Sequence, residues 1–399
     1  MNIIFHIDVN NAFLSWSAVY LLKQGYKEDI RKIPSVIAGD ESKRHGIVLA
    51  KSDISKKYGI KTAETLHSAR MKCKNLQVFP PNRDYYLEIS NKLYEYYLTY
   101  TPDVERYSID ECFLDLSNTS YLYDDILYLA YKIKDEIKEK YGFTVNIGIG
   151  NNKLCAKMAG DFSKPDKVHT LFLDEIKTKM WPLPIEDLLY IGKSSSNTLR
   201  KLNINTIGDL ANYDPTILKK YFKNNTNFMI EYANGIDDSK VISKNGKNKS
   251  ISLSETLEFD TNDSKFLKKK LLIMCEKIGA NLRRENLYAK TIAITIKTNY
   301  FKSYSHQKKI INQTNNTMEL YKNVLEIYDV IISNNLIRNI GVRVTDLTTN
   351  KSSQISLFDD QENIENNEKI QETLDNINLK YKDLKIMPAI FYDNRENNK

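Results

Sequence analysis

Two acidic sites in this chain carry side chains suited to the same chemistry. Asp8 lies near the end of an apolar run, and Asp110 and Glu111 follow about a hundred residues later within Ser108–Leu116. Adjacent carboxylates repel each other and are costly unless a cation neutralises them. Carboxylates at neighbouring strand ends suit Mg²⁺. Two such ions about 4 Å apart stabilise both the attacking and the leaving oxygen of an in-line phosphoryl displacement. The sequence therefore predicts Asp8, Asp110 and Glu111 as a catalytic centre.

A purely structural role for these acids is the main alternative at this point. Asp-Glu pairs are common in turns, and an aspartate at a strand end often acts only as a cap or as a solvated residue. The three carboxylates alone favour that alternative. The segments around them make a metal site more favoured than the carboxylates alone do.

The segments around the acids predict an α+β sheet. Asn2–Val9 is predicted as a buried strand, and Val104–Leu116 as a hairpin with Asp110 and Glu111 near its bend. Further strands are predicted at Ile33–Ala38, Ile47–Lys51 and Phe143–Ile149, and helices at Ala12–Leu22, Asp53–Tyr58, 84–100, 121–140 and from Lys153 towards Lys164. This order indicates a sheet with helices on one face.

The second half of the chain differs in character. Residues 183–234 are predicted as short helices, and the polar stretch 239–250 as a linker. A predicted helix at 265–285 alternates with predicted strands at 289–297 and 338–347, which indicates a small separate α+β domain. Beyond Thr348 the chain is polar and rich in Asn, so a flexible tail is expected.

Composition limits the class of protein. The chain has 399 residues, of which 41% are hydrophobic and 27% charged, as expected for two to four globular domains. No apolar run approaches the ~20 residues that span a bilayer, and no signal peptide is recognisable. The four cysteines lie far apart and are expected to be buried thiols in a reducing compartment. A cytoplasmic protein without membrane contact is expected.

Positive charge is concentrated in one segment. The net charge of the whole chain is +7, whereas residues 240–350 hold 19 Lys and Arg against 10 Asp and Glu, a net charge of +9. A basic domain on a nearly neutral body favours nucleic-acid binding, although charge alone is equally compatible with a solvated surface.

Taken together these segments resemble the Y-family, or translesion, DNA polymerases, particularly the bacterial DNA polymerase IV and UmuC-like group. The resemblance covers the chain from Phe5 to about Ala389. It depends on an ordered set of motifs, namely His6–Phe13, Tyr107–Glu111, Gly148–Met158, Lys164-Pro165 and Ile191-Gly192. Each motif alone is weak, but their order is specific.

The resemblance implies a multidomain α+β fold shaped like a right hand. The palm would comprise residues 1–11 and 80–166, the fingers 12–79, and a helical thumb with a helix-hairpin-helix 167–235. A linker at 236–248 would lead to a DNA-binding little finger at 249–347 and a tail at 348–399. A monomer is expected.

The resemblance also implies the reaction, which is template-directed addition of deoxynucleotides to a primer 3′-hydroxyl. Asp8 and Asp110 would hold two Mg²⁺ ions, Glu111 would help to hold one of them, and the Val9 carbonyl would complete the nucleotide-side site. Positioning and charge neutralisation would supply most of the catalysis. Low-fidelity synthesis past DNA damage is expected, as in DNA repair.

The expected nucleotide contacts are Asn11, Ala12, Phe13, Lys56 and Lys153. Phe13 matches the steric gate of the family, which excludes the ribose 2′-hydroxyl, although without the family it would be interpreted as a core residue. Lys153 lies near a predicted helix start, where an anion is attracted.

Two positions of the fingers depart from the family pattern. Asp53 and Lys56 occupy the places of a usual Tyr and Arg. Lysine loses the fork that grips two phosphate oxygens, and Asp53 should repel the triphosphate unless it turns away or pairs with Lys51 or Lys57. Weakened nucleotide affinity with retained activity is expected.

The expected DNA contacts lie in the thumb and in the basic domain. Gly192 and Lys193 would cradle a DNA phosphate, although Tyr190 replaces the first glycine of the usual Gly-x-Gly turn. In the basic domain the expected contacts are Lys247, Lys249, Arg338 and Arg343. Alternating β positions would aim these side chains at one face.

The tail contains one further motif, Gln354-Ile-Ser-Leu357-Phe358. It resembles the peptide that binds the bacterial sliding clamp, in which Gln lies at the rim while Leu and Phe fill an apolar groove. Two alternatives to an active polymerase remain open from the sequence. One is a polymerase-like protein that binds primer ends or the clamp and catalyses weakly, and the other is a two-metal nuclease, which explains neither Phe13 nor the clamp-like peptide.

Overall fold

The computed structural model describes residues 2–41, 44, 46–243, 248–331, 335–350, 369–371, 373–377, 380, 381 and 386. The chain divides into two compact units. The first comprises Met1–Glu41 and Gly46–Asn245, and the second Ser42–His45 and Gly246–Lys399.

The first unit is built on a five-stranded sheet with the order β5-β6-β1-β7-β8. Its strands are β5 (Val104–Arg106), β6 (Glu111–Asp115), β1 (Ile4–Val9), β7 (Val145–Gly150) and β8 (Val168–Leu171). β1 pairs antiparallel with β6 and β7, whereas β8 runs parallel to β7. β8 belongs to this sheet, although it lies beyond the palm boundary predicted at residue 166.

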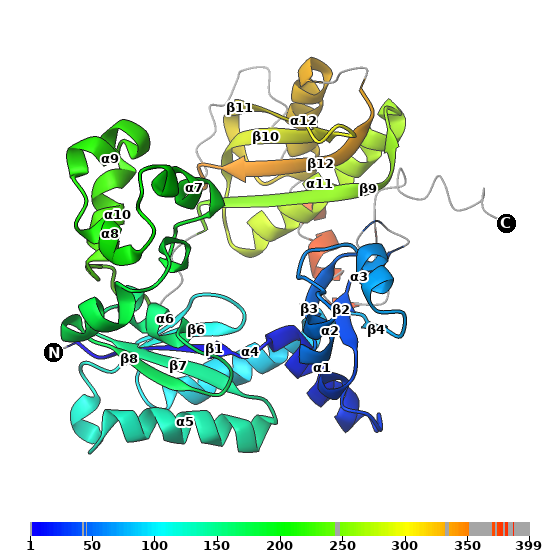
Figure 1. Cartoon of the computed structure of the whole chain (residues 1–399). Helices are drawn as coiled ribbons and strands as arrows, with labels where there is room; N and C mark the ends of the chain where they lie inside the picture. Colours follow the sequence, from blue (N-terminus) through cyan, green and yellow to red (C-terminus); the bar gives the residue numbers. More distant parts are fainter. Residues whose placement is uncertain are drawn as a thin grey trace. The chain divides into compact units, whose positions relative to one another are not determined.

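Two helices cover one face of this sheet. They are α4 (Arg83–Leu98) and α5 (Ile126–Tyr141), and their buried residues share one core with Phe5, Ile7 and Val9 of β1. α5 begins where the Asp125 side chain accepts a hydrogen bond from the Leu127 N–H, and it ends at Gly142 with a positive φ of 79°. Figure 1 shows α5 running along this face.

A third helix, α6 (Lys153–Asp161), packs on the opposite face of the sheet. The expectation of helices on one face was therefore wrong. The physical reason lies in β7, where a Cβ on Gly148 would come within 2.0 Å of the Ala156 carbonyl oxygen. The Gly148-x-Gly150 pair thus admits a helix at close range, and α6 covers the same face of β1 from which His6 and Asp8 project.

A smaller sheet lies next to α1 (Ala12–Lys23) in the first unit. Its strands have the order β3-β2-β4, with bounds Val48–Lys51, Ser35–Ala38 and Gln77–Phe79, and it is accompanied by α2 (Asp53–Lys57) and α3 (Leu66–Lys72). Ser52 caps α2 and Thr65 caps α3 through their side-chain oxygens. These elements lie within residues 12–79, the range predicted for the fingers.

Short helices make up the rest of the first unit. They are α7 (Lys193–Lys201), α8 (Ile207–Ala211), α9 (Pro215–Phe222) and α10 (Asn225–Ala233). Single turns of 3₁₀- or π-helix occur at Ile30–Lys32, Ser120–Leu122, Leu173–Glu175, Ile176–Met180 and Ile185–Asp187. The short helices share an apolar core with one side of α6, as expected for a helical thumb.

The second unit contains a four-stranded antiparallel sheet with the order β11-β10-β12-β9. Its strands are β9 (Ser250–Thr261), β10 (Ala289–Thr298), β11 (Ser303–Thr314) and β12 (Ile337–Thr345), and its helices are α11 (Ser264–Arg284) and α12 (Thr317–Ile331). The sequence predicted α11, β10 and β12 but not β9, β11 or α12. Ile340, Val342 and Val344 of β12 are buried in the core with the two helices, and Arg343 is exposed between them.

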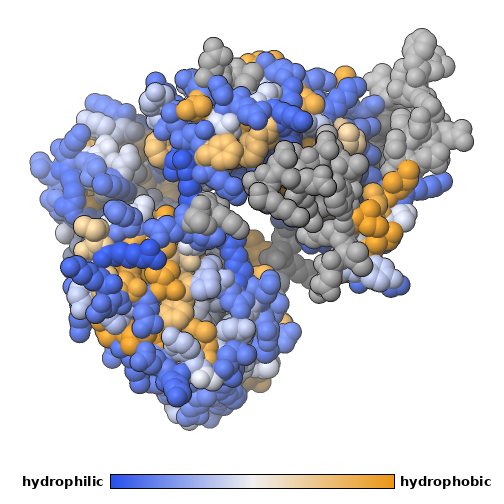
Figure 2. Space-filling model, turned by 90° about the vertical axis from the view of Figure 1, so that its right-hand side faces the viewer, coloured by the Kyte–Doolittle hydropathy of each residue, from blue (hydrophilic) through white to orange (hydrophobic). Residues whose placement is uncertain are grey.

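Three further features of the structure bear on the expected class of protein. Cys73, Cys112, Cys155 and Cys275 are free and buried, as predicted. Within the described ranges, no helix combines the length and apolar character needed to cross a bilayer. On the face drawn in Figure 2 hydrophilic residues predominate, and hydrophobic residues gather in several separate groups.

Candidate active site

Asp8 lies at the end of β1 and is largely buried, with 9% of its surface exposed. The Lys164 ammonium forms an ion pair with its Oδ2 atom and also pairs with Asp161 at 2.9 Å. Burial raises the pKa of the Asp8 carboxyl above its ordinary value, because a buried charge loses hydration, even though Lys164 favours the charged form. The carboxyl therefore lies where a further cation would be attracted.

Asp110 and Glu111 are brought beside Asp8 by the pairing of β1 with β6, in which Asp8 lies opposite Glu111. The Val9 N–H donates a hydrogen bond to the Asp110 carbonyl at 3.1 Å. The Ser108 hydroxyl donates to Asp110 Oδ1 at 2.6 Å and so fixes that carboxylate. The predicted hairpin is confirmed, with Asp110 at the end of its bend and Glu111 as the first residue of β6.

Glu111 has two partners on the same face of the sheet. His6 Nε2 lies 2.9 Å from Glu111 Oε2, and the Lys157 ammonium contacts the same oxygen. Burial opposes ionisation of Glu111, but the hydrogen bonds from His6 and Lys157 and the charge of Lys157 lower its pKa to about 2. Burial also lowers the pKa of His6, so the neutral imidazole donates Nε2–H to this carboxylate.

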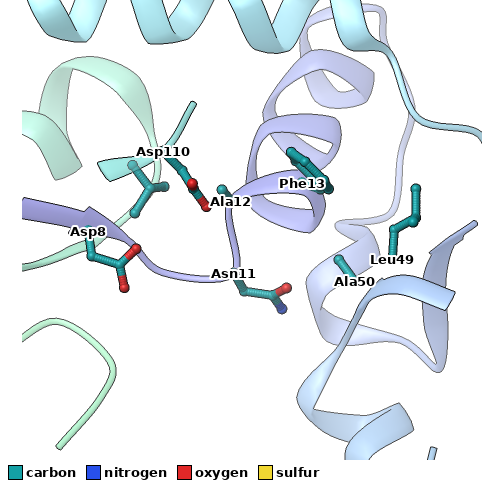
Figure 3. A pocket seen from close by; sticks show the side chains of 8 residues that line it. Asp8, Asn11, Ala12, Phe13, Leu49, Ala50 and Asp110 are labelled. Carbon is teal, nitrogen blue, oxygen red and sulfur yellow. The ribbon is translucent and has the colours of Figure 1, made fainter. Parts of the chain in front are cut away.

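An open pocket of about 290 Å³ lies where Asp8 and Asp110 meet α1 and β3. Asp8 and Asp110 line one side, Leu49 and Ala50 line the other, and Asn11, Ala12 and Phe13 lie between them. Val9 also lines the pocket. Figure 3 shows the two aspartates on the same side of the pocket. The structure thus brings together the predicted metal ligands Asp8, Val9 and Asp110 with three of the predicted nucleotide contacts.

The entry to α1 shapes the middle of the pocket. Asn11 adopts a left-handed backbone with φ 49°, and its side-chain amide donates to the Lys51 carbonyl at 2.7 Å. Phe13 stacks on Tyr86, with ring centroids 4.9 Å apart and an interplanar angle of 8°. The hydroxyl of Tyr86 is in turn 2.6 Å from that of Ser17. Phe13 is therefore held rigidly at the pocket by packing from behind.

Two lysines that the sequence analysis assigned no role hold the acids. Lys157 and Lys164 lie in and after α6, and they contact Glu111 and Asp8. The position of Lys164 is set by a buried amide network, because Asn146 donates to the carbonyls of Gly160 and Ser163 at 3.0 and 2.7 Å. Asn10 joins this network at 3.0 Å. The only signal in the sequence was the presence of both lysines within the quoted motifs.

The remaining predicted nucleotide contacts lie outside the residues that line the pocket. Lys153 pairs with Glu105, with Nζ 2.8 Å from both carboxylate oxygens, and its ammonium lies 5.1 Å from the ring centroid of Phe113. Asp53 and Lys56 are exposed on α2, the helix that follows β3 after the Ser52 cap. Among the described residues Asp53 has no ion pair, and Lys51 instead donates to Thr62 at 3.0 Å.

Comparison with known proteins places the chain in a family. The model of the impB/mucB/samB family matches residues 7–161, and that of its C-terminal domain matches residues 248–357. A DNA polymerase IV of Clostridium acetobutylicum is 45% identical over 394 residues, which cover 99% of each chain. A DNA polymerase IV of Acetivibrio thermocellus is 34% identical over 95% of this chain and 94% of that protein. A solved Y-family DNA polymerase chimera of Dbh and Dpo4 superposes with a TM-score of 0.76 over 87% of this chain and 100% of that chain, at 22% identity.

The chain belongs to the Y family of DNA polymerases, in the DNA polymerase IV group. The fold is that of a Y-family polymerase, with the parts expected for palm, fingers, thumb and little finger.

The donors at the polymerase site fit a divalent cation. Asp8 and Asp110 supply hard oxygen ligands on one side of the pocket, and the buried Asp8 carboxyl already attracts the Lys164 ammonium. Glu111 is engaged by Lys157 and His6. In the part of the chain that the structure describes, no group of three or more His, Cys, Asp or Glu side chains is arranged to hold a metal. Participation of Glu111 in metal binding therefore remains a prediction.

The predicted thumb contacts lie at the start of α7. Gly192 precedes Lys193, the first residue of the helix, and no side chain caps the helix start. Tyr190 has a positive φ of 69°, the conformation that a glycine adopts without strain. Tyr190 therefore places a side chain on a turn whose backbone conformation suits glycine.

The predicted contacts in the little finger are less uniform. Lys249 is exposed before β9, and Arg343 is exposed on the sheet face opposite the core, beside Ser252 and Ala293 in the register. Arg338 lies beside the irregularity between Ile337 and Asn339, and its guanidinium lies 5.0 Å from the ring centroid of Phe301. A common face for the two arginines remains a prediction. Lys247 and the clamp-like residues Gln354, Leu357 and Phe358 lie outside the described residues.

Proposed function

We propose that this DNA-directed DNA polymerase adds deoxynucleotides to a primer 3′-hydroxyl by two-metal phosphoryl transfer. One observation carries the proposal. Asp8 and Asp110 line the same pocket as Asn11, Ala12 and Phe13, so the reacting phosphate and the sugar of a nucleotide would lie on one continuous surface. The names of the relatives, which are DNA polymerases IV, support this reaction.

The residues that would hold two Mg²⁺ ions are Asp8, Asp110 and Glu111, together with the Val9 carbonyl. When bound, the ions would lower the pKa of the 3′-hydroxyl and neutralise charge on the phosphates. Ser108 fixes the orientation of the Asp110 carboxylate through the hydrogen bond of 2.6 Å. His6 does the same for Glu111 at 2.9 Å.

Lys164 and Phe13 would act on the nucleotide itself. The Lys164 ammonium lies at Asp8, so its positive charge is placed to meet a triphosphate that approaches the acids. The ring of Phe13 is buttressed by Tyr86 and cannot retreat without breaking the stack of 4.9 Å. A ribose 2′-hydroxyl would clash with this ring, which would exclude ribonucleotides.

Lys56 and Lys153 remain proposed contacts of the triphosphate. Lys56 is exposed on α2, and Lys153 would have to exchange its ion pair with Glu105 for the phosphates. Asp53 is exposed and follows Leu49 and Ala50 of the pocket closely in the chain, so its charge would oppose nucleotide binding by repulsion. We therefore expect weak nucleotide affinity, which fits a polymerase that synthesises past damaged templates with low fidelity.

DNA would be held through its backbone by the thumb and the little finger. Among the described residues no side chain caps the start of α7, so the amides at Gly192 and Lys193 suit a phosphate. Lys247, Lys249, Arg338 and Arg343 supply charge in the basic segment. Ser254 and Thr295, which flank Gly341 in the sheet register on the same face as Arg343, add hydroxyl donors for phosphate oxygens.

Three further parts of the proposal rest on the sequence. Gln354, Leu357 and Phe358 would dock the tail on the bacterial sliding clamp, which would raise the local concentration at a primer end. The protein would act as a monomer in the cytoplasm. Buried free cysteines agree with a reducing compartment.

A polymerase-like protein that binds primer ends with weak catalysis is the second candidate. It is favoured by one observation, which is that Asp53 has no ion pair among the described residues and so keeps its charge free near the pocket. Weak turnover would follow if repulsion prevented productive binding of the nucleotide.

Primer extension separates these candidates. The purified protein is incubated with primer-template, Mg²⁺ and four deoxynucleotides, beside Asp110→Asn, which keeps the shape and the hydrogen bond to Ser108. Asp124→Asn, at an exposed position, is the matched control. Extension by the parent and the control, but not by Asp110→Asn, is expected. Absence of extension by the parent, with retained binding of primer-template, would support the second candidate instead.

A further inference from the structure

Tyr190 has a backbone conformation that disfavours its own side chain. Its φ of 69° lies in the left-handed region, where the Cβ of any residue other than glycine is crowded. Its side chain is 60% exposed, so burial in a core does not explain the residue. The cost of this conformation must be offset by specific contacts of the ring and the hydroxyl.

The ring of Tyr190 belongs to an aromatic cluster of the thumb. Its centroid lies 5.7 Å from that of Phe228 and 5.8 Å from that of Tyr232, and the latter two rings are 4.1 Å apart. These distances are those of favourable aromatic pairs. The cluster fixes the direction in which Tyr190 leaves the thumb.

The hydroxyl of Tyr190 reaches the palm. It lies 3.3 Å from the hydroxyl of Tyr107, a residue 83 positions earlier in the chain. The ring of Tyr107 packs edge-on against Phe113 of β6, with centroids 5.3 Å apart. The tyrosine pair thus joins the thumb turn to the strand that begins with Glu111.

Tyr107 is in turn attached to the catalytic hairpin. Its backbone N–H donates to the Glu111 carbonyl at 3.0 Å. Its ring also lies under Lys157, with Nζ 5.0 Å from the centroid, and that ammonium binds the Glu111 carboxylate. Two short routes therefore connect Tyr190 with Glu111.

We propose that Tyr190 is a positioning residue that, through Tyr107, holds the turn at residues 190–192 at a fixed place relative to the catalytic hairpin before DNA binds. This inference rests on the proposed role of Gly192 and Lys193 as a phosphate contact. A turn that is already in place loses less conformational freedom when it meets the DNA backbone, so binding is tighter. The added side chain gives this chain a link between palm and thumb that a glycine cannot provide.

The test measures the dissociation constant of a fluorescent primer-template by anisotropy, without nucleotide or turnover. Tyr190→Ala and Tyr107→Ala are each expected to raise the dissociation constant about three- to ten-fold, the factor that corresponds to one hydrogen bond. The dissociation constant of the double variant is expected to be no higher than that of the single variant with the higher value, because both changes remove the same link. Tyr221→Ala is the control, since Tyr221 is an exposed thumb tyrosine without a ring contact among the described residues.

Tyr190→Gly distinguishes positioning from folding. Glycine accepts the positive φ, so thermal unfolding of this variant is expected at or near the temperature of the parent, while its DNA affinity is as low as that of Tyr190→Ala. Tyr190→Phe retains the thumb cluster but loses the hydroxyl contact, and an intermediate affinity is expected. The inference is wrong if Tyr190→Gly binds primer-template within two-fold of the parent, or if the two alanine changes multiply in the double variant.

These outcomes are separable from those of primer extension. A parent protein that binds DNA but does not extend it contradicts the proposed polymerase reaction and leaves the affinity comparison valid. A parent that extends DNA while all Tyr190 variants bind normally contradicts the positioning role alone.

Discussion

Asp53 provides the sharpest test of how this chain binds its nucleotide. It is the first residue of α2, directly after the Ser52 cap and two residues beyond β3, whose Leu49 and Ala50 line the pocket. It is exposed and has no ion pair among the described residues. Replacing it with asparagine removes the charge and keeps the shape. The Michaelis constant for deoxynucleotides is expected to fall.

The size of this effect follows from Coulomb's law. At one Debye length, about 8 Å in physiological salt, a pair of unit charges in water interacts by about 0.5 kcal/mol, and screening reduces this to about 0.2 kcal/mol. The three to four negative charges of a triphosphate would then contribute about 0.7 kcal/mol in total. Such a difference corresponds to about a three-fold lower Michaelis constant. Asp53→Tyr, which restores the residue usual in the family, should lower it by at least as much.

The Asp53→Asn variant should lose stability although it gains affinity for the nucleotide. A negative charge in the first turn of a helix is favourable by about 0.3–1 kcal/mol because it meets the positive end of the helix dipole. The variant should therefore unfold at slightly lower urea concentration while it binds nucleotide more tightly. A variant that binds nucleotide more tightly but is less stable shows a local electrostatic effect. A preparation with a larger fraction of active protein would not lose stability.

The assay measures single-nucleotide incorporation at several deoxynucleotide concentrations and at two salt concentrations. The gain in affinity should shrink as salt increases, because screening removes the repulsion that the substitution relieves. Glu319→Gln, in the first turn of α12 of the second unit, loses a comparable helix-dipole interaction; Glu319 is not among the residues that line the pocket, and this variant should leave the Michaelis constant unchanged. An unchanged or higher Michaelis constant for Asp53→Asn would refute the reasoning.

Three further expectations concern the pocket, the stability of the palm and the DNA face. Phe13→Val should reduce discrimination against ribonucleotides in single-nucleotide incorporation by about 10- to 200-fold. Leu49→Val, on the other side of the pocket, should leave this discrimination unchanged. Equal discrimination by Phe13→Val and the parent would argue against a steric gate. Burial opposes ionisation of Asp166, but hydrogen bonds from Lys138 and Lys134 lower its pKa, so its stabilising effect is present above the unfolded value near 4 and is lost as the pH falls below it. Asp166→Asn should therefore cost about 1–2 kcal/mol in urea unfolding at pH 7 and much less at pH 3, and an equal cost at both values would contradict this. Arg343→Ala should weaken DNA binding for every sequence and reduce the salt slope by about 1, and an unaltered slope in salt titrations would remove this residue from the proposed contacts.

The local elements of the fold could be predicted because they depend on short-range patterns. The apolar run before Asp8 and the alternation around Asp110 gave β1 and the hairpin with β6, close to the observed bounds. β11 was not predicted because it is polar over most of its length and resembles a loop in isolation, whereas β9 alternates Ile251, Leu253 and Leu257 with polar residues and could have been predicted from that pattern. They are strands because β12 and β10 supply hydrogen-bonding partners.

The close approach of α6 could not be predicted from Gly148 and Gly150, which in sequence resemble a weak phosphate loop. Only the packed structure shows that these glycines leave room for the helix backbone. The same packing brings Lys157 to Glu111 and, through the turn after the helix, Lys164 to Asp8. The partners of the acids therefore depend on contacts between segments that are about 50 to 150 residues apart.

The sequence by itself determined the chemistry available to this protein, because the types and order of Asp8, Phe13, Asp110 and Glu111 are local and specific. The tertiary structure alone decided how that chemistry is arranged. It placed Asp8 and Asp110 in one pocket, engaged Glu111 with His6 and Lys157, and linked Tyr190 of the thumb to Tyr107 of the palm. The physical reason is that a side chain's charge and shape are fixed by its identity, whereas its partners and its hydration are fixed only when distant segments pack together.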